Sequence, residues 1–313
     1  MHSLIRGLHH VTATVADAQH DLDFYSGLLG QRLVKKTVNF DNTGVYHFYY
    51  GNGAGTPGTI MTTFPYAGMG VRPGVHGTGQ ITITSFSVPS SAFPFWRERL
   101  SARSVAFAEA PTPVGEEALR LVDPSGLIIR LVGSRDDARE PWTHAGIDAA
   151  HAIRGIFGVT ILAHDDGPTL SFLTDVMDGT IIAQSGGATR AGVGGTGAGH
   201  IVEVERTSAA VRAVNGIGTV HHVAFGVADA TAQLDMRRAL LDRRFQVTEV
   251  MDRQYFTSIY FREPGGVLFE IATIPPGFAT DEPLAELGRL LKLPPWEESR
   301  RAEIAAALPS VAT

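Results

Sequence analysis

One pattern of secondary structure recurs four times along this chain of 313 residues. Hydrophobic periodicity predicts a strand, a helix and then three further strands in segments 7–64, 79–132, 153–206 and 218–274. The third copy is the least regular, because a glycine-rich stretch at 186–199 interrupts its later strands. A unit of this length cannot bury its hydrophobic face alone, so the copies must pack against one another.

A turn signature supports the repeat. Residues 122–132, VDPSGLIIRLV, align without gaps on residues 262–272, REPGGVLFEIA. Each stretch has an acidic residue, a proline and a turn that ends in glycine, followed by a strand. Proline presets φ and glycine supplies the positive φ that a tight hairpin needs. In this register Arg130 stands where Glu270 stands in the last copy.

We therefore predict an α+β fold of four βαβββ modules, paired into two curved-sheet domains that each leave a cleft on one side. The predicted modules and their pairing are 1–66 with 218–274, and 77–135 with 153–207. The remaining residues, 275–313, form a C-terminal helical tail. Within it, the periodicity of 281–293 predicts an amphipathic helix that packs on the outside or on a partner subunit.

The first strand of each outer module contains two consecutive histidines, in GLHHVTATV at 7–15 and TVHHVAFGV at 219–227. Side chains alternate between the two faces of a strand. The face that His221 would share is large and apolar, whereas the face of His222 is small and polar. Alternation therefore predicts that His10 and His222 line the cleft. It sends His9 and His221 to the packed face or to the strand edge.

Glu270 lies in the apolar run VLFEIA of the last module, where a buried carboxylate needs a partner or a cation. Two imidazoles and one carboxylate that converge on a cleft form the 2-His-1-carboxylate face, which suits non-haem Fe(II). The inner modules lack this set, because Phe157 and Gly158 replace the first histidine pair and Arg130 replaces the acid. The asymmetry predicts one metal site, built from the first and last modules.

Composition excludes several other classes of protein. The net charge of −6 comes without a long run of one sign, so nothing recruits nucleic acid or an anionic membrane. The absence of cysteine excludes disulfides, thiolate ligands and a cysteine nucleophile. We find neither a signal peptide nor a membrane-spanning apolar stretch, and we expect a cytoplasmic protein.

The motifs HHVTATV, HHVAFGV and REPGGVLFEIAT, in this order and spacing, resemble the vicinal oxygen chelate (glyoxalase/bleomycin resistance/extradiol dioxygenase) superfamily. The tail sequence PPGFATDEPLAELGRLLKLPPWEESRRAEIAAALP is similar to that of the hydroquinone-type ring-cleaving dioxygenases, and the resemblance runs over residues 7–309. It implies Fe(II) held by His10, His222 and Glu270, with Mn(II) or another divalent metal as the alternative.

The resemblance also implies roles for residues around the metal. Tyr260 matches a tyrosine that touches substrate oxygen, and Arg253 matches an arginine behind it. His9, Thr12 and His221 match residues around the pocket, with His221 as an acid–base group. This role for His221 conflicts with strict alternation, and a bulge or the strand edge would reconcile the two.

The resulting expectation is an Fe(II) dioxygenase that opens hydroquinones or related aromatic diols with O₂ and works as a homo-oligomer. Two rivals are a glyoxalase or isomerase on the same scaffold and a non-catalytic binding protein. Glyoxalases commonly use a fourth protein ligand, but Thr62 stands at the matching position. We further expect His47 to be an ordinary strand residue, and residues 192–197 to form a flexible loop that could cover the cleft.

Overall fold

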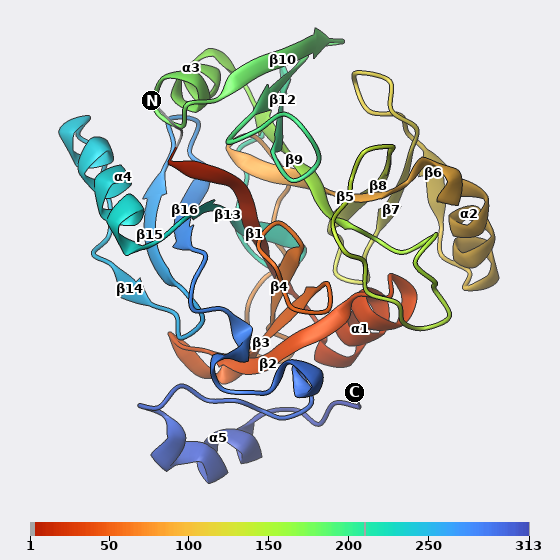
Figure 1. The fold of residues 1–313 in the computed structure, drawn as a ribbon, viewed down its shortest axis with the longest axis vertical. Helices are drawn as coiled ribbons and strands as arrows, with labels where there is room; N and C mark the ends of the chain where they lie inside the picture. Colours follow the sequence, from red (N-terminus) through yellow and green to blue (C-terminus); the bar gives the residue numbers. More distant parts are fainter. Residues whose placement is uncertain (1–3, 210, 313) are drawn as a thin grey trace.

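The computed structural model describes residues 4–209 and 211–312. Its body consists of two eight-stranded curved sheets (Figure 1). One sheet has the strand order β14-β15-β16-β13-β1-β4-β3-β2, and the other has β10-β11-β12-β9-β5-β8-β7-β6. The first sheet therefore joins the first and last modules, and the second joins the inner two. The predicted α+β fold class is confirmed.

The strands of the two sheets are defined as follows. The first sheet contains β1 (Ile5–Val15), β2 (Arg32–Asn39), β3 (Asn42–Gly51), β4 (Ile60–Pro65), β13 (Thr219–Val227), β14 (Met251–Asp252), β15 (Thr257–Arg262) and β16 (Leu268–Thr273). The second contains β5 (Gln80–Pro89), β6 (Phe107–Glu109), β7 (Ala118–Val122), β8 (Ile128–Ser134), β9 (Gly155–Ala163), β10 (Thr180–Ser185), β11 (Ala188–Gly192) and β12 (Ile201–Arg206). The third module thus has all of its strands, with β11 inside the glycine-rich stretch.

Each module carries one helical segment between its first and second strands. The helical segments are α1 (Ala18–Leu22) with the π-helical η1 (Asp23–Leu28), η2 (Ser90–Ala92) with α2 (Phe93–Ala102), α3 (Gly167–Asp175) and α4 (Ala230–Asp242). Two of the four begin at an aspartate whose side chain accepts hydrogen bonds from the first backbone N–H groups, Asp17 for α1 and Asp229 for α4. None of the helices among the described residues is long and apolar enough to cross a membrane.

The predicted tail helix at 281–293 is wrong. The tail has short helical turns at η3 (Phe278–Thr280), η4 (Leu284–Glu286) and η5 (Glu298–Arg300), and an α-helix follows at α5 (Arg301–Ala307). Tertiary contacts with β2 hold the segment in an irregular path of bends and turns instead. Lys35 pairs with Asp281 and Glu282, and the Lys292 backbone N–H donates to the carbonyl of Lys36 at 2.9 Å.

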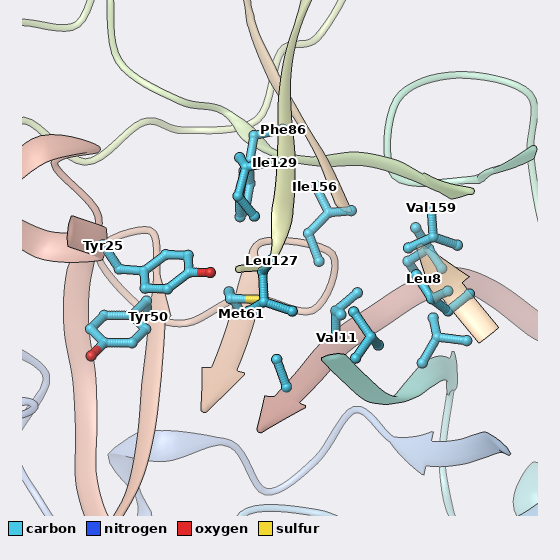
Figure 2. Packing of buried hydrophobic residues seen from close by; sticks show 14 of the residues in the cluster. Leu8, Val11, Tyr25, Tyr50, Met61, Phe86, Leu127, Ile129, Ile156 and Val159 are labelled. Carbon is cyan, nitrogen blue, oxygen red and sulfur yellow. The ribbon is translucent and has the colours of Figure 1, made fainter. Parts of the chain in front are cut away.

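One hydrophobic core joins the two sheets. Figure 2 shows Val11 and Met61, from the first sheet, facing Phe86 and Ile156 from the second sheet and Leu127, which directly precedes β8 of that sheet. All of these side chains are at most 2% exposed. One face of each sheet therefore packs into this shared core. A separate apolar cluster, which includes Tyr49, Phe256 and Phe278, covers part of the opposite face of the first sheet and borders its pocket.

The loop 193–200 does not cover the cleft of the first sheet. It packs against the start of β1, where the Leu8 backbone N–H donates to the carbonyl of Gly199 at 2.8 Å. No residue of this loop is among the described residues that line the pocket beside His10 and His222. The expectation of a lid from 192–197 is wrong.

Candidate metal centre

Three side chains meet at one point on the concave face of the first sheet. His10 comes from β1, His222 from β13 and Glu270 from β16, and each is at least 94% buried. The Nε2 atoms of the two histidines are 3.3 Å apart, and they lie 3.3 Å and 2.9 Å from Oε2 of Glu270. Neighbouring ligands on an ion with bonds of about 2.1 Å are about 3 Å apart when they subtend a right angle. The spacing fits one face of a metal ion.

Two β-bulges explain why histidines occur in pairs. Along the antiparallel β1–β13 ladder, Leu8 and His10 oppose the consecutive residues Phe225 and Ala224, so His9 is an extra residue in β1. The same happens in β13, where His221 is extra between His222 and Val220. A bulge re-aims the side chains beside it, so strict alternation fails there. Strict alternation, which sends His9 and His221 to the packed face or to the strand edge, is therefore wrong here, and the bulge named as one way to reconcile the role of His221 is present.

Each extra histidine contacts its ligand neighbour. The Nδ1 atoms of His9 and His10 are 2.9 Å apart, and those of His221 and His222 are 2.8 Å apart. One nitrogen of each pair must donate and the other must accept. If His10 and His222 carry their proton on Nδ1 and donate it to the neighbouring ring, both Nε2 lone pairs face Glu270. This is the tautomer that a metal requires, and the neighbouring rings are placed to accept its Nδ1 proton.

Electrostatics at the site match a cation. Burial lowers the pKa of His222, and it lowers the pKa values of His9 and His221 to about 3, so these rings are neutral at pH 7. Burial would raise the pKa of Glu270, but the facing imidazoles of His10 and His222 hold it well below its ordinary value. The carboxylate is therefore ionised.

The hydrogen bonds of Glu270 leave one oxygen for a metal. Its Oε1 accepts a hydrogen bond from the Ser258 hydroxyl, whereas the buried Oε2 accepts none. A buried carboxylate oxygen without a donor is costly, and a divalent ion between it and the two lone pairs would remove that cost. The residues present fit a divalent metal.

A pocket of about 380 Å³ opens beside the three ligand atoms, a size typical of small-molecule sites. Tyr260 lies next to Glu270 in the β15–β16 ladder, and its ring is 5.7 Å from that of His222. The Nε–H of Arg253 donates to the Tyr260 hydroxyl oxygen at 3.2 Å, and its Nη1 reaches Asp41 of the first module at 3.3 Å. Tyr260 and Arg253 therefore line the pocket, as do Thr12 and His221, whereas His9 is not among the described residues that line it.

The pocket also contains a residue that sequence reasoning missed. His47 on β3 is not an ordinary strand residue, because it lines the pocket and belongs to a hydrogen-bonded chain. Its Nδ1 is 2.9 Å from the Tyr49 hydroxyl, and its Nε2 is 2.9 Å from Oγ1 of Thr62. Thr62 in turn donates to Thr12 at 2.8 Å. The signal available in the sequence was its spacing from Tyr49, since residues two apart share a strand face.

The second sheet has no such site. Among residues 4–209 and 211–312, His10, His222 and Glu270 are the one group of three or more potential ligands within 4.8 Å of one another. At the place of Glu270, Arg130 donates to Glu203 at 3.0 Å, and Arg190 reaches the other oxygen of Glu203 at 2.7 Å. These two guanidinium groups already neutralise the carboxylate of Glu203, which a metal ion would otherwise need as its ligand.

The fold and the site together define a class of proteins built from paired βαβββ modules with a candidate metal site, and sequence comparison identifies the family. Residues 7–131 and 155–271 match the model of the glyoxalase/bleomycin resistance protein/dioxygenase superfamily. The chain belongs to this superfamily.

Relatives within the superfamily narrow the comparison. The chain is 44% identical over 309 residues to MhqE of Bacillus subtilis (strain 168), whose name assigns it to the ring-cleaving dioxygenases, with coverage of 97% of this chain and 99% of that protein. It is 36% identical to the chlorohydroquinone/hydroquinone 1,2-dioxygenase of Sphingobium indicum (strain UT26S), covering 96% and 95% of the two chains. A crystal structure described as that of a dioxygenase from Bacillus subtilis superposes with a TM-score of 0.94 at 40% identity, covering 99% and 98%.

Proposed function

We propose that this protein is an Fe(II)-dependent dioxygenase that opens the ring of hydroquinones or related aromatic diols. The observation that carries the proposal is the buried set of His10, His222 and Glu270, whose ligand atoms lie 2.9–3.3 Å apart at the edge of a pocket. Relatives with this type of activity in their names, at 36–44% identity over nearly the whole chain, support it.

The donor set favours iron among the divalent metals. Two neutral imidazoles and one carboxylate on one face leave several coordination positions open, which suits non-haem Fe(II). When bound, Fe(II) would supply a Lewis acid that lowers the pKa of a substrate hydroxyl and the redox chemistry that lets O₂ react with an aromatic ring. Mn(II) or another divalent ion is the alternative occupant.

The chain's own residues bind the substrate and move its protons. Burial raises the pKa of Tyr260, so its hydroxyl stays protonated and can donate a hydrogen bond or a proton to a substrate oxygen. Arg253 fixes the orientation of that hydroxyl. His9 and His221 hold the ligand rings in place through their Nδ1 atoms, and His221 also faces the pocket as a candidate acid–base group. Thr12 closes the wall beside His10.

The position of Arg253 favours a 1,4-diol over a catechol. A catechol can offer two adjacent oxygens to the metal and leaves none for a distant contact. A hydroquinone can offer one, and its second hydroxyl lies across the ring, where a fixed cation could meet it. Arg253, held by Tyr260 and Asp41, is the cation of the pocket wall.

The proposal extends to the setting of the enzyme. We propose that it acts in the cytoplasm, takes only a small aromatic diol and O₂ as partners, binds no nucleic acid, and assembles as a homo-oligomer. Exposed apolar side chains on the tail, namely Leu284, Leu290 and Trp296, support an assembly. Light scattering at several concentrations and cell fractionation would check these two points.

Oxygen uptake tests the proposal. Metal-free protein is loaded with Fe(II) under anaerobic conditions and offered methylhydroquinone, chlorohydroquinone and catechol in an oxygen electrode. We expect uptake with the hydroquinones to exceed uptake with catechol, and none without metal. Absence of uptake with every diol would refute the proposal. Isomerisation of a hemithioacetal would move the protein to the glyoxalases, and diol binding without either reaction would make it a binding protein.

A further inference from the structure

A second pocket, of about 310 Å³, lies on the other side of His221 from the metal pocket. Its walls come from the segments that connect the two sheets. Thr78 pairs with Arg212 in an isolated bridge, so the connection before β5 and the connection before β13 run side by side. The turn between β15 and β16 closes the pocket. Ligand sites are common at such junctions between domains.

This pocket is positively charged. The charged side chains that line it are Arg212 and Arg262, and no lining residue is acidic. Within the described part of the chain, neither guanidinium makes an ion pair with a carboxylate. Arg262 donates from Nη1 to the carbonyl of Gly266 at 2.7 Å, and its other nitrogens remain available. Two arginines without an acid form a local exception in a chain with a net charge of −6.

The acid closest in sequence does not neutralise these arginines. Glu263 lies in the same turn as Arg262, but its side chain is 2% exposed and fully engaged. Its carboxylate accepts hydrogen bonds from the backbone N–H groups of Gly265 and Val267 and from the hydroxyl of Thr169. The turn therefore uses its own carboxylate internally and presents only the guanidinium to the pocket.

The two arginines are accessible to a ligand. Arg212 and Arg262 are both exposed side chains, so their guanidinium groups can be reached from solvent. Gln80, at the start of β5, also lines the pocket, but its Oε1 is buried and accepts no hydrogen bond. The ligand that fits therefore has an anionic group for the arginines.

The second pocket adjoins the metal pocket directly. His221, His222 and Leu268 line both cavities, so the two are separated by one layer of side chains. A molecule that forms beside Glu270 could therefore place a charged end in the second pocket after a short movement. Any ligand of the second pocket would also contact the ring that orients His222.

We propose that the second pocket binds the carboxylate of the ring-opened product, an unsaturated hydroxy-oxo acid. This inference rests on the proposed function. In that reaction O₂ is the oxidant and the bond between a hydroxyl-bearing ring carbon and its neighbour breaks. One oxygen atom makes the first carbon a carboxylic acid, the other makes its neighbour an aldehyde, and the hydrogens are retained. The acid then releases a proton to water. Negative charge thus appears only in the product, which the arginines distinguish from the neutral substrate.

Binding of cis,cis-muconate, an unsaturated six-carbon dicarboxylate, tests the inference. Titration calorimetry is run on Fe(II)-loaded and on metal-free protein, with wild type, the double variant Arg212→Gln/Arg262→Gln, and Arg243→Gln. The last removes an exposed arginine of the α4 end that contacts its own helix. We expect the double variant to bind muconate at least tenfold more weakly, with Arg243→Gln unchanged and with binding retained in metal-free protein.

The outcomes separate this inference from the proposed function. Binding that disappears with the metal but does not respond to the arginines would mean that muconate binds the metal itself, which overturns the inference. Absence of any binding also overturns it. If muconate binding depends on the arginines but no diol supports oxygen uptake, the anion pocket stands and the proposed reaction fails. If uptake occurs and binding ignores the arginines, only the pocket assignment fails.

Discussion

Replacement of Glu270 by glutamine should abolish tight metal binding while leaving the fold intact. Glutamine has nearly the same shape as glutamate, and its carbonyl oxygen can still accept the hydrogen bond from Ser258. The change removes the one negative charge that faces the Nε2 atoms of His10 and His222 at 3.3 Å and 2.9 Å. It also relieves the metal-free protein of a buried ionised group, so the variant should fold at least as well without metal.

The size of the effect follows from the role of the residue. Changes outside the ligand set typically cost 10–100-fold in metal affinity. Loss of the anionic member of a three-ligand set should exceed this and reach about 10³-fold, or about 4 kcal/mol. At a metal concentration of about 100 times the wild-type Kd, binding stabilises the native state by about 2.7 kcal/mol. At the same concentration the variant would gain only about 0.1 kcal/mol.

Thermal unfolding with and without metal provides the assay. For a chain of this size, about 2.7 kcal/mol corresponds to an upward shift in Tm of roughly 4 °C. We expect this shift for wild type with Fe(II) under anaerobic conditions or with Mn(II), and no measurable shift for Glu270→Gln. Glu263→Gln, which alters another buried glutamate of the same module, is the matched control and should keep the shift. An equal shift in wild type and Glu270→Gln would refute the metal assignment.

Three further predictions concern turnover, pH and the tail. Tyr260→Phe should lower turnover by about 10²–10⁴, with one equivalent of metal still bound, as oxygen uptake and metal analysis would show. Below pH 6.5 the metal-free protein should lose stability. The pKa values of His9 and His221 are lowered to about 3 in the folded protein, so the unfolded chain binds protons at these rings more readily. The free energy of unfolding from denaturant titration should be lower at pH 5 than at pH 7.5 by about 2 kcal/mol for each ring. Lys35→Met should lower the free energy of unfolding by about 3 kcal/mol, because it removes the buried cation that pairs with Asp281 and Glu282. The double variant Lys35→Met/Glu282→Gln should recover part of this loss, as denaturant unfolding would show.

The parts of the site that the sequence predicts are those with a local signature. A glutamate inside an apolar strand is unusual in its own neighbourhood, so Glu270 could be singled out without knowledge of the fold. The repeat of strand, helix and three strands then places it beside the histidine pairs. Comparison among the four copies shows which of them could bind a metal, because Arg130 and Gly158 interrupt the ligand pattern in the inner two.

The parts that the sequence could not predict depend on partners distant in the chain. A bulge exists only relative to the opposite strand, so the extra position of His9 or His221 is invisible in either strand alone. The role of His47 depends on Thr62, which lies on β4 and holds the His47 ring in the pocket. The tail at 281–293 has helical periodicity, but ion pairs with Lys35 hold its first residues in a bend.

The second sheet shows that the bulges belong to the scaffold and not to the metal. In the β5–β9 ladder the extra residues are Thr82 and Phe157, at the places of His221 and His9. A backbone that re-aims two side chains at the centre of each sheet is thus present with and without ligands. The two sheets differ in the side chains beside these bulges and in the side chain at the position of Glu270.

Charge decides which of the two clefts can hold a cation. In the first sheet Glu270 meets the imidazole rings of His10 and His222 and keeps one oxygen without a donor. In the second, Glu203 on β12 is held by Arg130 and Arg190, and both of its oxygens are engaged. A divalent ion there would have to displace two buried guanidinium groups, which have no other carboxylate of equal burial to pair with. The repeat therefore supplies two equivalent frames, and side-chain charge restricts the metal chemistry to one of them.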